Sequence, residues 1–569
     1  MRFSPIVTTV SAAVGFLCMG SALALGTVNG PKMVRAQPLA RVYYNALLAN
    51  AGDPGDDDTA ISLDPNLSAL CQSYIGQLNN YNNPRPNADQ INHDAIVLAG
   101  TQTGCSTAQN ETTLDVNPEN PRNLVGGTND YRVFNTREGR QDGSGWAYTT
   151  FDRGRTWLDV QVPHLTYQTG ATGLLSDMDS AGDPAIAFGR HNTVYYANLV
   201  FSRLNSASGV VVSTSHDGGQ TWGEPSIVHT DGVDASGNPL PTGVFNDKEW
   251  ITVDPRSGAV YVTWTSFDPD RTSPIQVSRS DDGGQTWSAP VSVNPTSSFT
   301  PGGVTPYSSG SNPRVNRHGD LVIAYEAAVC QSLNCDQVTD HDAIIIATSR
   351  DHGRTFSNTA VAINYDFPRN ADTRRDTLTG ENFRINSFPQ LTIDPETDAL
   401  YATWSDDRNG QYDASGNSVK TNGDVFVVGS RDGRNWSGAY QVGTASDEVY
   451  PAITAFDGKV AVTFYTRAYD PNGIGLDYAY AAVSEGNLAD FAHARVHRMS
   501  SQTSNPQIQF VALGLVTKKV LQGVFIGDYT AAAMGADGVL HGSWTDFRGE
   551  PGVTAPNQDA YSQAVEIDD

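Results

Sequence analysis

One short phrase recurs along the chain and constrains its fold more than any other feature. It reads STSHDGGQTW at residues 213–222 and SRSDDGGQTW at 278–287. Copies of the template S/T-x-D-x-G-x-T-W/F lie at 150–157, 215–222, 280–287, 349–356 and, in shortened form, 430–436. The aspartates of successive copies are 65, 65, 69 and 81 residues apart. Repetition at so long a period indicates a repeated structural unit.

The phrase has the chemistry of a tight hairpin turn. Its aspartate accepts turn amide hydrogens, its glycine supplies positive φ, and its terminal aromatic residue fills the gap between adjacent sheets. A calcium loop is the alternative interpretation, but the spacing does not match an EF-hand and the closing glutamate is missing. We therefore interpret each copy as a structural turn.

A second pattern alternates with these turns. It consists of a short strand, a turn rich in Asp, Pro and Gly, and a second apolar strand. Seven such hairpins occur, at 112–130, 183–201, 249–267, 312–328, 388–406, 450–467 and 528–546. An outer strand and a turn phrase complete each four-stranded unit. The last unit has three strands, and we predict that residues 94–102 supply its fourth and close the ring.

The turn phrase is the Asp-box, and through its five copies the chain resembles the sialidase (BNR-repeat) superfamily of β-propellers. The predicted fold class is all-β, a propeller of four-stranded blades with Asp-box turns over residues 94–569. The repeat count gives seven blades. Six blades, as in typical sialidases, are the alternative.

The chain before the propeller has two parts. Residues 1–24 have the form of a secretory signal peptide, with an apolar run and small residues at Ala22 and Ala24. Residues 25–93 carry helical periodicity, which predicts a small helical N-terminal appendage. We predict a secreted or periplasmic protein with no membrane insertion after signal removal.

Four cysteines remain after the signal peptide. An even number in an exported chain favours two disulfides, and proximity favours the pairs Cys71–Cys105 and Cys330–Cys335. The net charge of −26 excludes nucleic acid and anionic membranes as partners because both repel such a chain. Through the resemblance, the predicted partner is a glycan or glycoconjugate.

Arginines recur at the ends of the predicted hairpins. The phrases WSDDR (404–408) and WTDFR (544–548) have relatives at 464–467 and 128–132. Because the pattern is repeated, we interpret it first as an Asp–Arg brace between blades, and second as an anion-binding clamp. The arginines concerned are Arg132, Arg408, Arg467 and Arg548.

A catalytic site is asymmetric and is expected to break the repeat. Asp247 lies where other units have a proline-led entry, Asp528 and Tyr529 open the seventh hairpin, and Glu326 ends the fourth. Acidic groups and a tyrosine at one opening suggest a carbohydrate site. The resemblance implies Tyr529 as nucleophile, Glu326 as its partner, Asp247 as acid/base, and Asp528 with the four arginines as substrate-binding groups.

The sialidase phrase F/Y-R-I-P is broken in this chain. FRIN occurs at 383–386, but Arg384 lies five residues before Pro389 instead of two, and the first hairpin has no such arginine. Three functions therefore stay open: sialidase-type glycoside hydrolysis, non-catalytic binding of a glycan or protein, and an assembly or scaffold role, which fits the count of seven blades. The sequence gives no evidence for a required cofactor, and the acidic loops at 406–417 and 469–473 are candidates for structural calcium.

Overall fold

The computed structural model describes most of the chain after residue 108. The described residues are 34–35, 39, 109–135, 137, 140–269, 272–294, 303–336, 339–370, 375–506, 511–513, 520–522, 525–548 and 558–567. The predicted signal peptide, nearly all of the predicted helical appendage, Cys71, Cys105 and the predicted strand at 94–102 lie outside them.

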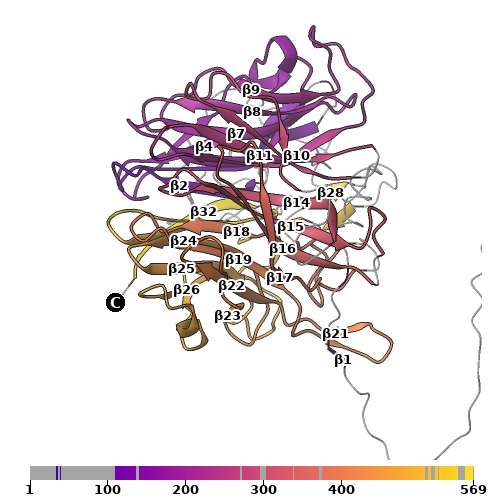
Figure 1. Ribbon diagram of the computed structural model, residues 1–569, viewed down its shortest axis with the longest axis vertical. Helices are drawn as coiled ribbons and strands as arrows, with labels where there is room; N and C mark the ends of the chain where they lie inside the picture. The colour runs from indigo at the N-terminus through magenta and orange to yellow at the C-terminus, as the bar shows by residue number, and fades with distance from the viewer. Residues whose placement is uncertain are drawn as a thin grey trace, which may run out of the picture.

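Seven antiparallel sheets form the body of the molecule (Figure 1). The first strands contact one another around the ring and so line its axis. They are β2 (Gln109–Val116), β6 (Ser180–Phe188), β10 (Phe245–Val253), β14 (Val304–Val315), β18 (Gln390–Ile393), β24 (Glu448–Phe456) and β30 (Ala531–Met534). Their order along the chain is the order of blades 1 to 7. The seven-blade prediction is confirmed, and the six-blade alternative is wrong.

Each inner strand pairs with the next strand of its blade along a short hairpin. The second strands are β3 (Leu124–Asn135), β7 (Val194–Phe201), β11 (Val260–Phe267), β15 (Leu321–Cys330), β19 (Leu400–Asp406), β25 (Lys459–Thr466) and β31 (Val539–Asp546). The third strands are β4 (Arg140–Thr150), β8 (Ser208–Ser215), β12 (Ile275–Ser280), β16 (His341–Ser349), β22 (Asp424–Ser430), β26 (Asp477–Val483) and β32 (Asp559–Glu566). All seven predicted hairpins therefore form the inner halves of the blades.

Six blades have a fourth, outermost strand. These strands are β5 (Leu158–Gln161), β9 (Ser226–Asp231), β13 (Val291–Ser292), β17 (Ser357–Ile363), β23 (Tyr440–Val442) and β27 (His497–Arg498). Blade 7 has three strands among the described residues, as the sequence predicts. Blade 1 meets blade 7 where Gln109 N donates to Gln558 O at 2.6 Å. Residues 94–102 as the fourth strand of blade 7 stay a prediction.

Smaller elements lie in the connections. Short 3-10 helices are η1 (Tyr167–Thr169), η2 (Gly173–Leu175) and η3 (Leu488–Ala492), and a minor sheet pair joins β28 (Val511–Leu513) to β29 (Val520–Gln522). The strand β1 (Val34–Arg35) pairs with β20 (Gln411–Tyr412), which pairs with β21 (Ser418–Lys420), at the edge of blade 5 (Figure 1). Across the described residues no helix has the length and apolarity needed to span a bilayer.

The five Asp-box turns connect the third and fourth strands of blades 1 to 5. In the second copy, Ser215 Oγ and Thr221 N donate to Asp217 Oδ1 at 2.8 and 3.0 Å, and Thr221 Oγ1 donates to Asp217 Oδ2 at 2.6 Å. Gly219 N donates to Ser215 Oγ at 2.9 Å with φ at 95°. Both carboxylate oxygens are used by the turn itself, which confirms the structural interpretation over a calcium loop.

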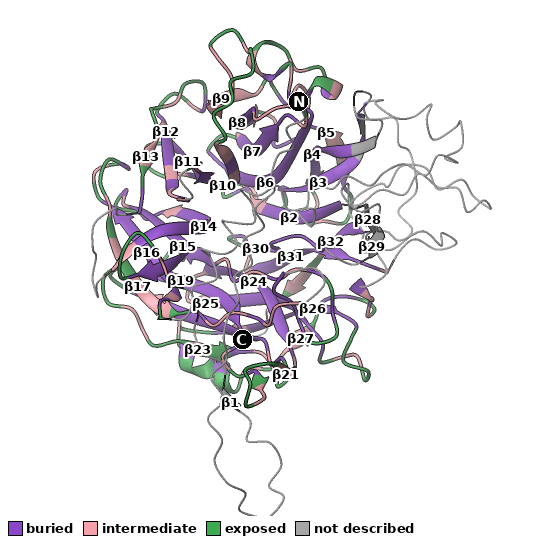
Figure 2. Cartoon of the chain, turned by 90° about the vertical axis from the view of Figure 1, so that its right-hand side faces the viewer, coloured by how far each residue is buried: buried purple, intermediate pink, exposed green. Residues whose placement is uncertain are grey.

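The Asp-box tryptophans pack against the preceding blade. Trp222 packs edge-on against Tyr196, in a cluster with Val125 of blade 1, and Trp287 Nε1 donates to Ser226 of blade 2 at 3.0 Å. Trp157 and Trp222 are buried, whereas Trp287 and Trp436 are partly buried. Figure 2 shows that the blade strands are mainly buried and that exposed residues concentrate in the connecting loops. The tryptophans therefore fill the space between blades.

Replacing Asp217 by alanine is expected to lower the free energy of unfolding by about 1–2 kcal/mol, because hydrogen bonds to a charged acceptor are lost at a partly exposed turn. His216→Ala in the same turn is the matched control, because the His216 side chain is exposed. Thermal and urea denaturation measure the difference. An equal effect of the two substitutions would contradict the role of the aspartate.

The disulfide Cys330–Cys335 joins the end of β15 to the loop that follows it, as predicted. Its Cα atoms are 5.1 Å apart, within the usual range for a disulfide. The pairing of Cys71 with Cys105 stays a prediction.

Candidate functional site

The two faces of the propeller differ in what they carry. The Asp-box turns follow the third strands, so they lie on the face where the first strands end. The opposite face, called here the site face, carries the starts of the first strands and the ends of the second strands. All the sequence-predicted site residues belong to these segments. The predicted site residues therefore all lie on the site face.

Backbone bulges interrupt five first strands near the site face. The register shifts between Asn110 and Thr113 in blade 1, and at the equivalent places in blades 2, 3, 4 and 6. Each bulge contains one residue with positive φ: Glu111 (55°), Asp183 (51°), Lys248 (53°), Gly310 (65°) and Tyr450 (51°). Bulges re-aim side chains, and a non-glycine residue at positive φ costs about 1–3 kcal/mol. The strain is offset by the contacts that these side chains make.

Lys248 is the centre of a buried ionic cluster. Its Nζ lies 2.8 Å from Asp183 Oδ2, 2.8 Å from Asp528 Oδ2 and 3.3 Å from Glu111 Oε1. The lysine side chain is 8% exposed, and the three carboxylates are more deeply buried still. The cluster joins blades 1, 2, 3 and 7 at the axis. We call these four residues the lysine hub.

The segment before β18 of blade 5 contacts the hub through Arg384 and Asn386 of the FRIN phrase. Arg384 donates from Nε to Asp528 Oδ1 at 3.0 Å and from Nη2 to Asp528 Oδ2 at 2.5 Å. Asn386 Nδ2 donates to Asp528 Oδ1 at 2.8 Å. Asp528 therefore accepts from two cations and one amide.

The charges of the hub set its protonation. Burial opposes the charged form of Lys248, but the carboxylates of Asp183, Asp528 and Glu111 outweigh it and raise the pKa of the lysine. Arg384 and Lys248 likewise outweigh burial and lower the pKa of Asp528. Burial and the neighbouring Asp183 raise the pKa of Glu111 well above its usual value. Lys248 is therefore a permanent cation at physiological pH.

A cavity of about 100 Å³ opens beside the hub on the site face. Its wall combines carboxyl groups, cations, aromatic rings and small polar groups. The lining carboxyls are Asp247, Glu326, Asp366, Asp376 and Asp528, the cations are Lys248, Arg375 and Arg384, and the rings are Phe267, Phe367 and Phe388. Such a volume has room for several water-sized groups.

The structure brings three of the predicted site residues together. Asp247 from blade 3, Glu326 from blade 4 and Asp528 from blade 7 line the same cavity. Tyr529 is not among the lining residues. Its hydroxyl donates to Pro184 O at 3.1 Å, its ring packs edge-on against Trp250, and burial raises its pKa well above the usual value. In this geometry the tyrosine is a packed core residue between blades.

The predicted arginines are engaged by carboxylates. Arg408 Nη2 contacts Asp406 Oδ2 at 2.6 Å, and Arg548 Nη2 contacts Asp546 Oδ2 at 2.8 Å. Arg467 pairs with Glu381 at 2.5 Å and with Asp447 at 2.9 Å. Arg408 and Arg548 each pair with an aspartate of their own blade and also donate to the preceding blade, Arg408 to Ile363 O at 3.3 Å and Arg548 to Ser501 Oγ at 2.6 Å, which is the geometry of a brace between blades. Arg132 lies in β3, and its side chain is outside the described residues.

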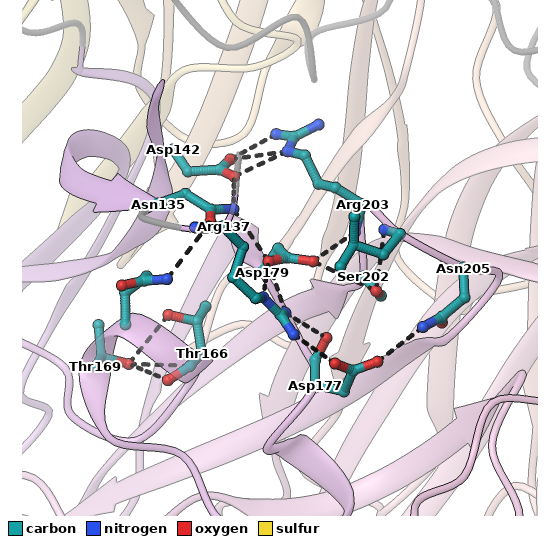
Figure 3. A network of polar contacts seen from close by, with 12 residues as sticks. Asn135, Arg137, Asp142, Thr166, Thr169, Asp177, Asp179, Ser202, Arg203 and Asn205 are labelled. Carbon is teal, nitrogen blue, oxygen red and sulfur yellow. Dashed lines mark hydrogen bonds and ion pairs between the residues drawn. The ribbon is translucent and has the colours of Figure 1, made fainter. Parts of the chain in front are cut away.

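A second ionic network fixes the loops of blades 1 and 2 on the site face (Figure 3). Arg137 contacts Asp177 at 2.5 Å and Asp179 at 2.6 Å, and Arg203 contacts Asp142 at 2.6 Å. The arginines and aspartates come from the β3–β4 loop, β4, the segment before β6 and the segment after β7. Both arginines are held in place by these pairs, which makes the network a support for the loops around the axis.

Sequence reasoning missed Lys248 and Arg384 as site residues. Lys248 stands in the repeat-breaking phrase FNDKEW, and Arg384 stands in FRIN, so both had a signal in the sequence. The spacing of FRIN argued against Arg384 because it differs from the sialidase phrase. The structure places Arg384 in the cavity wall all the same.

The two acidic loops proposed for calcium use their carboxylates locally. Asp413 Oδ1 accepts from Ser415 N and Asn417 N at 2.8 and 2.9 Å. Asp470 Oδ2 accepts from Ile474 N and Gly475 N at 3.0 and 2.6 Å. Backbone amides thus stabilise both aspartates, and calcium at these loops stays a prediction.

Fold and site together define an Asp-box β-propeller with a cavity of charged groups and aromatic rings on the face opposite the Asp-box turns. No protein-family model matches the chain, and no curated protein matches it. Solved structures do show similarity. A protein of unknown function from Dyadobacter fermentans DSM 18053 is 14% identical with a TM-score of 0.41, over 68% of this chain and 95% of that one.

Two enzymes are similar at the same level. The intramolecular trans-sialidase from Ruminococcus gnavus is 12% identical with a TM-score of 0.40, over 69% of this chain and 95% of that one. The α-L-arabinofuranosidase Arb93A from Fusarium graminearum is 13% identical with a TM-score of 0.35, over 69% and 93%. The chain is thus similar in structure to sialidase and arabinofuranosidase propellers, at low sequence identity.

Proposed function

We propose that the protein is an exported propeller that binds a neutral glycan in the cavity of the site face. The observation that carries the proposal is the composition of the cavity wall, which combines aromatic rings with carboxyl, guanidinium and amide groups from blades 3, 4, 5 and 7. A ligand with many hydroxyls and apolar ring faces fits such a wall, because carboxylates and amides accept and donate its hydrogen bonds while the rings cover its C–H faces.

The charge of the cavity favours a neutral ligand over a sialoside. Five carboxyls face three cations in the wall. Lys248 and Arg384 are already bound to Asp528, so neither is available to a ligand carboxylate without breaking a buried ion pair. An anionic sugar would add a charge of the same sign as the excess.

The disulfide supports the exported location. Cys330 and Cys335 form a bond that persists in oxidising compartments and is rare in the cytosol. Together with the sequence of residues 1–24, this supports a secreted or periplasmic protein that acts on extracellular glycans.

A glycan array with neutral and sialylated oligosaccharides tests the proposal. We expect binding to neutral glycans and a loss of at least about tenfold in affinity, or about 1.4 kcal/mol, for Asp247→Asn, because its carboxylate lines the cavity. Asp281→Asn is the matched control, since Asp281 is 71% exposed on the Asp-box turn of the same blade. Equal binding by Asp247→Asn and wild type would contradict the site.

The hydrolase alternative has its own measurement. Turnover of fluorogenic α-sialosides by the wild type that is abolished in Tyr529→Phe would contradict the proposal of neutral-glycan binding. It would support sialidase chemistry through Tyr529, Glu326 and Asp247. We expect no turnover, because the Tyr529 hydroxyl is bound to the Pro184 carbonyl in the core.

A further inference from the structure

Three acidic side chains converge at one end of blade 4. Asp342 of β16 is paired with Ala328 of β15, and Glu326 lies two residues before Ala328, so the two acids share one face of the sheet. Asn364 directly follows β17, where Ile363 pairs with Ala343, which places it opposite Asp342. Asp366 completes the group. The strand register therefore brings these side chains together.

The oxygens of this group have the spacing of ligands to a single ion. One carboxylate oxygen from each of Glu326, Asp342 and Asp366 lies within 4.8 Å of the others. Calcium binds oxygens at 2.3–2.6 Å, so two ligand oxygens on opposite sides of the ion lie about 4.6–5.2 Å apart. Glu326 is 5% exposed and Asp342 is fully buried, so their charges are poorly screened by water.

The neighbouring charges favour a cation at this place. The groups that act most strongly on the Glu326 carboxyl through their charge are Asp342, Asp376 and Asp406, and all three are acidic. A bound divalent cation would offset the repulsion among these acidic groups.

Asn364 supplies an independent observation. The residue is fully buried, its Nδ2 donates to Glu326 Oε1, and its Oδ1 has no hydrogen-bond partner. A buried amide oxygen without a partner is costly. Rotation of the amide by half a turn exchanges its two ends, because they differ only in donor and acceptor character, and turns Oδ1 toward the carboxylates.

We propose that Glu326, Asp342, Asp366 and Asn364 form a divalent-cation site of the calcium type. The ligand set consists of carboxylate and amide oxygens, which suits a hard cation, and it contains no imidazole or thiolate for zinc or copper. Glu326 and Asp366 line the cavity, whereas Asp342 and Asn364 lie behind it. The remaining coordination positions of the ion therefore face the cavity, where water or the hydroxyls of a ligand occupy them.

Calcium titration of the EDTA-treated full chain, followed by calorimetry and by terbium luminescence, tests the site. We expect one saturable site with a Kd of about 10⁻⁴–10⁻³ M, the range of extracellular calcium modules. Asp342→Asn is expected to weaken binding at least about tenfold, because one charged ligand is lost. Asn364→Asp is expected to tighten it several-fold by adding a charged ligand.

The controls separate this site from other acidic groups. Asp413→Asn lies in the acidic loop at 406–417 and is expected to bind calcium like the wild type. No saturable binding up to about 10 mM, ten times the weak end of the expected range, would overturn the proposal. So would a loss of binding in Asp413→Asn with retention in Asp342→Asn. If Asp342→Asn does not fold, Asn364→Asp decides alone, because unchanged or weaker binding contradicts the site.

The link to the glycan rests on the proposed function and has a separate readout. Glycan binding is expected to fall at least about tenfold in EDTA and to return with calcium but not with magnesium, which demands near-ideal octahedral geometry. Calcium binding without any glycan dependence would confirm the ion site and contradict its role in ligand recognition. Glycan binding without any calcium binding would support the proposed function and contradict the ion site.

Discussion

Replacing Lys248 by methionine is expected to lower the free energy of unfolding by about 3–5 kcal/mol, the cost of removing one partner from a buried ion pair. Methionine retains most of the side-chain volume, so the loss of stability measures the effect of removing the charge. Glu111, Asp183 and Asp528 then face one another without the cation that lies 2.8–3.3 Å from each. Thermal and urea denaturation measure the change, with Lys420→Met on exposed β21 as the control.

A double variant identifies the cause of this loss. Asp183→Asn combined with Lys248→Met removes one of the stranded charges together with the cation. The double variant is expected to be more stable than Lys248→Met alone, because residues in one ionic network are not additive. A change below about 1 kcal/mol for Lys248→Met, the level of a surface ion pair, would contradict the hub.

The second large effect is a fall in stability as pH rises from about 4 to 8. Burial raises the pKa of Asp407 and Asp424 to about 7 and that of Glu448 to about 8, against the opposing hydrogen bonds of their neighbours. The folded protein therefore holds these protons more tightly than the unfolded chain does. The contribution of these groups to the free energy of unfolding is fully present below the unfolded-state pKa. It falls as pH rises toward the folded-state pKa, by up to about 1.4 kcal/mol per pH unit for each group.

The Asp-box aspartates affect the pH dependence of stability in the opposite direction and in a lower pH range. Hydrogen bonds lower the pKa of Asp152 and Asp217 against a burial effect that raises it, and they lower those of Asp282, Asp351 and Asp432 as well. Their contribution is present above the unfolded-state pKa and is lost as pH falls below about 4. The melting temperature is thus expected to be highest near pH 4–5.

Melting temperatures from pH 3 to 9 check this expectation. Asp424→Asn removes one of the buried acids and is expected to flatten the decline between pH 5 and 8. Asp281→Asn, at an exposed position, is expected to leave the profile unchanged. A melting temperature that is constant or rises over pH 5–8 in the wild type would contradict the assignment of these carboxyls as protonated groups.

The propeller could be predicted from the sequence because its signals are local. An Asp-box turn is built within a few residues, as the contacts of Asp217 with Ser215 and Thr221 show. The braces are equally local, since Arg408 pairs with an aspartate two residues away. Blade count, turn position and brace geometry therefore follow from spacing alone.

The hub could not be predicted because its contacts join distant segments through unusual backbone. Lys248 meets Glu111 across 137 residues, and Asp528 meets Arg384 across 144. These contacts depend on bulges where Glu111, Asp183 and Lys248 take positive φ, a conformation that residues of these types rarely adopt. No residue pattern in the sequence predicts these bulges. Tyr529 shows the same difficulty, since its position in the repeat does not tell where its hydroxyl points.

The five bulges also bear on how such a ring tolerates rearrangement. Their central residues are glutamate, aspartate, lysine, glycine and tyrosine, so the blades share a backbone but are chemically distinct at the axis. Cutting the chain between two blades and joining its ends preserves the cyclic order, and with it every pairing at the centre. Exchanging blade 3 with blade 5 keeps the same composition but moves the lysine away from its acids. The contacts at the axis therefore depend on the order of the repeats, even though the residues that form each sheet lie within a single repeat.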